Sequence, residues 1–201
     1  MCIRDRDRPV TLAAFAEDFY THFMGQYLSF RDRREDYLSY PISFEKLAPL
    51  VEGDRYLKDA YETMVIKKQE DDWDGMWNLA SRLPAALATV KKKKIVQIID
   101  EFQNINAYIY DYRGERIDPL SGTYLDLAEK KEAPLIISGS EVHGLLEIVR
   151  RLTARIEENV LENLPEEEAK ESIWKYAEIF HTKIDDAGVD KLWNLTRGDP
   201  L

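Results

Sequence analysis

Two adjacent carboxylates, Asp100 and Glu101, directly follow a mostly β-branched apolar run over residues 95–99. Such a run predicts a short strand that is buried on both faces. Because α/β proteins bind ligands at the carboxyl ends of their strands, we expect the pair at a binding rim. One carboxylate could hold a divalent metal ion while the other polarises an attacking water. The pair could equally be two polar residues at a strand end.

A second apolar run over residues 134–137 predicts another strand, and Ser138-Gly139-Ser140 follows it. The simplest interpretation of these three residues is a turn from a strand into a helix, with Ser140 as the helix cap. A ligand-binding role for the serines is compatible with that interpretation, because both predicted strands would deliver polar groups to the same edge.

The remaining pattern predicts helices around these strands. Apolar residues recur at intervals of three and four, and Thr11, Ser43 and Asp54 stand at helix-capping positions. Strands that alternate with helices imply an α/β layer with parallel pairing. A short strand is an open alternative over 155–164. The expected helices cover residues 12–30, 43–52, 54–69, 71–90, around 124–131, 142–152, 166–183 and 186–195.

Longer segments resemble a known family. KKKKIVQIIDEFQNI and EAPLIISGSEVHGL are similar to the P-loop ATPases often described as archaeal-type ATPases, which belong with the AAA+ and STAND groups. LTARIEENVLENLPEEEAKESI resembles that family's entrance to a helical lid, and LWNLTRGDP resembles its LTGGNP motif. The resemblance runs from about Lys91 to the C-terminus.

The resemblance implies the fold class α/β, as a partial P-loop NTPase three-layer sandwich with a parallel sheet and a C-terminal helical lid. The α/β domain would cover residues 1–164, with a helical segment at 12–90 and the Walker B and sensor strands at 95–140. A truncated lid domain would begin at 165 and continue to 201.

The resemblance also implies roles for individual residues, with ATP and Mg²⁺ as cofactors. Asp100 would be the acid that holds Mg²⁺, and Glu101 would be the base that activates water. Ser138 and Ser140 would form the sensor turn near the γ-phosphate. Gln103 continues the family's Asp-Glu-Phe-Gln motif without an assigned role.

Three further positions are implied to contact the nucleotide. Arg155 matches the family arginine before the lid and would reach a phosphate or a neighbouring subunit. Gly198 and Pro200 would lie near the adenine base. Arg197 and Asp199 stand where the family has Gly and Asn, so this part of the motif departs from the pattern.

The expected phosphate-binding loop is missing from the sequence. A P-loop needs Gly-x4-Gly-Lys-Ser/Thr, and none of the nine glycines is followed by Lys. In the family that loop precedes the region that matches 12–30, so we expect it upstream of Met1. The opening residues 1–6 also resemble a sequencing-adapter artefact. The chain is therefore expected to be a fragment that alone is poorly stable and does not bind ATP well.

The composition limits the cell compartment and the classes of partner that we expect. There are 28 basic and 38 acidic residues, and a net charge of −10 argues against a general nucleic-acid coat. The single cysteine excludes a disulfide framework, and no apolar run reaches the roughly 18 residues of a membrane span. These features predict a cytoplasmic protein. Its expected partners are ATP and either another copy of the chain or a fused effector domain.

The expected function is an ATP-binding and ATP-hydrolysing molecular switch, in which turnover rearranges the lid. Two alternatives remain open from the residues. One is a non-catalytic, ATPase-like scaffold that has lost turnover. The other is a helical protein-interaction module in which the two strands are misread, and the aromatic-rich residues 12–90 favour it mildly.

Overall fold

The computed structural model describes residues 10–39, 42–106, 108–117, 130–151, 157, 159 and 162–199. Its contacts divide the chain into two compact units, Met1–Ile156 and Glu157–Leu201. The boundary expected from the sequence, between residues 164 and 165, falls inside the second unit and stays a prediction.

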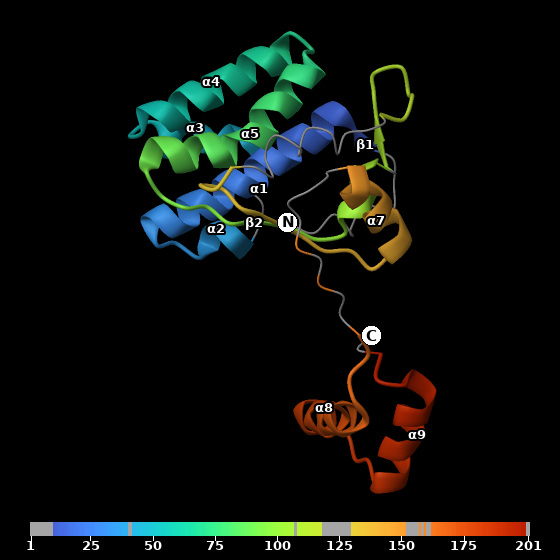
Figure 1. Ribbon diagram of the computed structural model, residues 1–201. Helices are drawn as coiled ribbons and strands as arrows, with labels where there is room; N and C mark the ends of the chain where they lie inside the picture. The colour runs from blue at the N-terminus through green and yellow to red at the C-terminus, as the bar shows by residue number, and fades with distance from the viewer. Residues whose placement is uncertain are drawn as a thin grey trace. The chain divides into compact units, whose positions relative to one another are not determined.

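Helices build most of the first unit. Figure 1 shows α1 (Leu12–Asp32) beside α5 (Trp73–Lys91), with α3 (Phe44–Val51) and α4 (Arg55–Gln69) packed against this pair. The short helix α2 (Asp36–Ser39) follows α1. Within the described residues, none of the helices combines the length and the apolar character needed to cross a membrane.

Local signals explain where these helices begin. The Thr11 hydroxyl accepts a hydrogen bond from the backbone N–H of Ala14 at 3.3 Å, so it caps α1. Asp54 caps α4 in the same way, because one of its oxygens accepts from Tyr56 N at 3.1 Å and from Leu57 N at 3.3 Å. The helices expected over 12–30, 54–69 and 71–90 are confirmed to within about two residues, and α5 continues through Pro84.

One apolar core fills the space between these helices. Trp77 of α5 lies against two rings of α1, with ring centroids 5.1 Å from Phe15 and 5.6 Å from Phe19. Each large apolar side chain buried here contributes roughly 1.5–3 kcal/mol. The largest fully buried side chains are Phe15, Tyr20, Met24, Leu28, Leu47, Leu57, Met64, Met76, Leu83, Leu87 and Phe102.

The strands are few and short in the described part of the chain. The strand β1 (Val10–Thr11) pairs in parallel with β3 (Ile109–Tyr110), and β2 (Gln97–Ile99) pairs in parallel with β4 (Leu135–Ile137). These are two separate sheets of two strands each. Two-residue strands such as β1 and β3 leave no periodic signal in a sequence, which is why the sequence did not predict them.

The expected three-layer α/β sandwich is therefore wrong. The described residues are mostly helical, and β2 is not buried on both faces, because Ile98 is 57% exposed and Ile136 of β4 is 53% exposed. A sandwich needs helices on both faces of a sheet. Here the apolar side chains of residues 12–90 are used in packing helix against helix.

Other differences are local. The short helix η1 (Phe102–Asn106) follows β2, and α7 (Val142–Arg151) agrees with the helix expected after the second strand. The helix expected around 124–131 lies outside the described residues except for 130 and 131, which are not helical. Residues 157, 159 and 162–164 form no strand, and the rest of 155–161 lies outside the described part.

The second unit contains two helices, α8 (Glu166–Ile179) and α9 (Asp186–Thr196). The Lys170 ammonium joins them, at 2.7 Å from Glu166 Oε1 and 2.6 Å from Asp190 Oδ1. Its apolar core is small, because Ala169 and Val189 are the buried apolar residues among those described in this unit.

Candidate functional site

Parallel pairing brings the ends of β2 and β4 together. The register sets Gln97 beside Leu135 and Ile99 beside Ile137. Backbone hydrogen bonds extend the alignment past the strands, since Ser138 N donates to Ile99 O at 3.0 Å and Phe102 N donates to Ser138 O at 2.9 Å. The residues that follow the two strands are therefore held next to each other, as the sequence predicted.

Asp100 and Ser138 form the first contact across this edge. The Ser138 hydroxyl donates to Asp100 Oδ1 at 2.6 Å, which is short for an O–H···O bond and typical of a charged acceptor. Ser138 is exposed and Asp100 is half-buried. A carboxylate and a hydroxyl thus lie side by side at a position that solvent can reach.

Glu101 forms the second contact, and it is buried, with 8% of its surface exposed. One oxygen, Oε2, accepts from the Ser140 hydroxyl at 3.0 Å, from Ser140 N at 3.4 Å and from the Gln103 side-chain amide. No described residue donates to the other oxygen, Oε1. These contacts hold the carboxylate in place through its Oε2 oxygen.

The backbone of Glu101 supports this placement at an energetic cost. Its φ is 54°, in the left-handed region that a non-glycine residue adopts only at a cost of roughly 1–2 kcal/mol. Strain of this kind persists only where the surrounding contacts enforce it, and it is concentrated at functional sites. The three hydrogen bonds to the side chain are contacts of that kind.

Gln103 is the residue whose role the sequence did not assign. Its side chain is buried and donates to Glu101, while its Oε1 has no hydrogen-bond partner among the described residues. Gly139 makes room for it, because a Cβ at that position would overlap Gln103 Oε1. A glycine between two serines beside a Glu-x-Gln pattern is the sequence signal that could have pointed to this contact.

The donor set fits part of a Mg²⁺ site. Carboxylate and hydroxyl oxygens are the ligands that Mg²⁺ prefers, and protein sites often supply one or two of them while water and substrate phosphates supply the rest. Among the described residues no group of three or more His, Cys, Asp or Glu side chains could hold a metal alone. A cation at Asp100 would therefore need phosphate oxygens as further ligands.

The nucleotide contacts expected of Arg155, Gly198 and Pro200 stay predictions. Arg155 and Pro200 lie outside the described residues. Gly198 lies in the second unit, where its φ is 81° and its carbonyl accepts from Leu164 N at 2.9 Å. It ends α9 by fixing the chain against Leu164, and its expected contact with adenine stays a prediction.

Comparison with protein-family models, with curated proteins and with solved structures finds no match for this chain.

Proposed function

We propose that Asp100, Glu101 and the turn over 138–140 belong to a Mg²⁺-dependent ATPase of the archaeal-type P-loop family that the motifs resemble. The observation that supports the proposal is the meeting of two carboxylates from the end of β2 with two hydroxyls from the end of β4. The order of the motifs along the chain, Asp-Glu-Phe-Gln and then Ser-Gly-Ser, also supports the proposal, because it resembles the order in that family.

Each side chain has one task in this proposal. Bound Mg²⁺ would neutralise charge on the phosphates, and Asp100 with Ser138 would hold it. Glu101 would accept a proton from water at Oε1 as the water oxygen bonds to the terminal phosphorus. The bond between that phosphorus and the leaving diphosphate oxygen breaks, and the products are ADP and phosphate. Ser140 and Gln103 would keep Glu101 oriented.

The phosphate-binding loop would have to come from sequence outside the 201 residues printed above, since no glycine here precedes a lysine. Reading the coding DNA in frame before the Met1 codon tests this requirement. The proposal expects Gly-x4-Gly-Lys-Ser/Thr within a few dozen codons. A frame that is open over that distance and lacks the loop would contradict it.

The metal role of Asp100 is tested in the full gene product by D100N. The Mg²⁺ concentration for half-maximal phosphate release should rise by about tenfold or more, because one anionic ligand is lost. D74N is the matched control, since Asp74 is an exposed carboxylate at the start of α5. Equal Mg²⁺ dependence in D100N and D74N would exclude Asp100 as the ligand.

Hydrolysis would act as a switch by moving the expected lid, residues 165–201. That movement would be passed to another copy of the chain or to a fused effector domain. The setting that we propose is the cytoplasm, as the composition suggested. Arg155 and Pro200 keep their proposed places near the nucleotide.

A second candidate is a helical protein-interaction module, and one feature of α8 favours it. Tyr176, Ile179 and Phe180 are exposed on one side of that helix, and the rings of Tyr176 and Phe180 are stacked with centroids 6.3 Å apart. Exposed apolar patches often mark interaction sites. A gene product that binds a partner protein and shows no phosphate release would support this candidate, or the non-catalytic scaffold, over the ATPase.

A further inference from the structure

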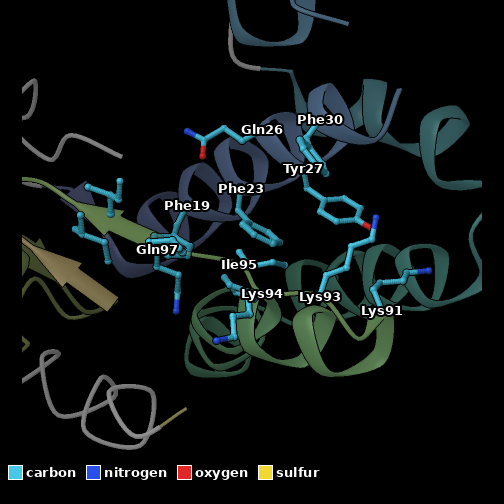
Figure 2. Close-up of a pocket in the computed structure, with 14 residues that line it drawn as sticks. Phe19, Phe23, Gln26, Tyr27, Phe30, Lys91, Lys93, Lys94, Ile95 and Gln97 are labelled. Atoms are coloured by element: carbon cyan, nitrogen blue, oxygen red, sulfur yellow. The ribbon is translucent and has the colours of Figure 1, made fainter. Parts of the chain in front are cut away.

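A pocket lies between α1, α5, the segment that leads into β2 and β2 itself, and neither Asp100 nor Glu101 lines it. Figure 2 shows rings of α1 facing that segment, which carries Lys93, Lys94 and Ile95. The pocket has a volume of about 330 Å³, within the range of small-molecule sites. No part of the proposed nucleotide chemistry uses it, so it is an independent candidate.

The pocket extends along α1. Four aromatic residues of α1 spaced by three or four positions line it, namely Phe19, Phe23, Tyr27 and Phe30. From Phe19 to Phe30 the helix rises about 16 Å, because each residue adds about 1.5 Å. A volume of about 330 Å³ distributed over that length suits an unbranched chain better than a compact ring system.

Most of its wall is apolar, and part of it is open to water. The rings of Phe23 and Tyr27 are stacked with centroids 6.3 Å apart, and Val96 and Ile98 also line the pocket. Phe30 is 74% exposed, and Val96 and Ile98 are also exposed. Covering this surface with an aliphatic chain would gain roughly 25 cal/mol for each Å² of apolar area removed from water.

The charge at the pocket is positive although the chain as a whole carries −10. Lys91, Lys93 and Lys94 line it, and none of the described lining residues is acidic. The Lys91 ammonium is engaged by Asp54 at 2.5 Å. Lys93 and Lys94 form no ion pair with any described residue, and the Lys93 ammonium lies 5.9 Å from the centre of the Phe30 ring.

We propose that this pocket binds a linear, medium-chain aliphatic carboxylate, with the chain along α1 and the carboxylate at the Lys93 ammonium, which lies near the Phe30 ring. The lining along α1 favours an unbranched apolar body, and the Lys93 ammonium favours an anionic head. The same apolar chain without the charge would contact the apolar walls and leave Lys93 without a counter-ion.

The probe is decanoate below its micelle concentration, titrated into the full chain by isothermal calorimetry. We expect saturable binding with one site per chain. Decanol should bind at least about fivefold more weakly, which corresponds to the loss of one partly exposed ion pair. The absence of saturable decanoate binding, or decanol binding of equal strength, would overturn the proposal.

Two variants locate the site. The double change K93Q/K94Q should weaken decanoate binding about fivefold or more, and F30S should weaken it through lost apolar contact. K130Q/K131Q is the matched control, because these lysines are adjacent, are described in the same unit and do not line the pocket. Decanoate affinity that changes equally in K93Q/K94Q and K130Q/K131Q would show general charge attraction and contradict the proposal.

All four substituted lysines, and Phe30, lie at the surface, so we expect each variant to keep the wild-type circular dichroism and melting temperature. A second probe, the compact aromatic anion naphthoate, separates the contribution of ligand shape to binding from that of charge, because it has the same charge as decanoate and a different shape. It should bind more weakly than decanoate, and stronger binding of naphthoate would exclude a linear ligand.

Discussion

At the residue scale, Gly139 decides whether Gln103 can hold Glu101. A methyl group at position 139 would overlap Gln103 Oε1, so G139A should push the Gln103 side chain away and break its bond to Glu101. We expect a loss of about 1 kcal/mol in the free energy of unfolding. In ¹⁵N NMR, the Gln103 side-chain amide should move to the position of a solvated glutamine.

G53A is the control for that change, because a Cβ at Gly53 meets nothing within 4 Å. If the Gln103 amide signal is the same in G139A as in G53A, Gln103 does not lie against Gly139 in solution, and its bond to Glu101 is not tested by that substitution's size.

Tyr20 is a second residue whose environment makes a clear prediction. It is fully buried in the core, its hydroxyl has no hydrogen-bond partner among the described residues, and burial raises its pKa well above the usual value. A buried polar group without a partner costs roughly 1–3 kcal/mol. Y20F should therefore raise the free energy of unfolding by about 1 kcal/mol in urea titrations. A less stable Y20F would reveal a partner for the hydroxyl.

At the element scale, Asp54 ties the start of α4 to the end of α5. It caps α4 through two backbone N–H groups, and the Lys91 ammonium lies 2.5 Å from its Oδ2. Burial alone would raise the pKa of Asp54, but the hydrogen bonds from Lys91 and from Leu57 N outweigh it, so the pKa lies below its ordinary value. The ionised form is the one that stabilises the fold.

The sign of the pH dependence follows from that lowered pKa. The stabilisation is fully present above the unfolded pKa of about 3.9 and is lost as the pH falls through the lower folded value. D54A should cost about 1–2 kcal/mol at pH 7, measured by chemical denaturation. The difference from wild type should shrink below about pH 4. If D54A costs the same free energy down to pH 2, the lost stability comes from packing and not from the ionised carboxylate. D59A is the control, because Asp59 lies on an exposed face of α4.

The elements also show which features of the fold the sequence can specify. Helix positions were predicted well because capping residues such as Thr11 and Asp54 and a 3.6-residue apolar period are local signals. The meeting of Asp100 and Glu101 with Ser138 and Ser140 was predicted because parallel strands align their carboxyl ends.

The layer arrangement could not be predicted in the same way. A run such as residues 95–99 has the same composition whether one face or both faces of its sheet are covered. Glu101, which accepts the hydrogen bond from Gln103, has a left-handed backbone that no local sequence pattern indicates.

At the scale of the whole molecule, the two units should differ in stability. The first unit buries a large helical core, whereas among the described residues of the second unit the buried apolar side chains are Ala169 and Val189. Regions with little buried apolar surface open at lower free energy. Hydrogen exchange followed by mass spectrometry should show α8 and α9 exchanging faster than α1 and α5. Equal protection would mean that further contacts cover the second unit.

The most direct test of the central claim is phosphate release by the full gene product and its E101Q variant, each with Mg²⁺ and ATP. Glutamine keeps the shape and the hydrogen bonding of Glu101 but cannot take a proton. We therefore expect ATP affinity to stay within about twofold while the release rate falls by roughly 10²–10⁴-fold, the usual contribution of a general base. E132Q, which changes an exposed glutamate just before β4, should behave as wild type. An E101Q rate equal to that of wild type, or no release from wild type, would contradict the account.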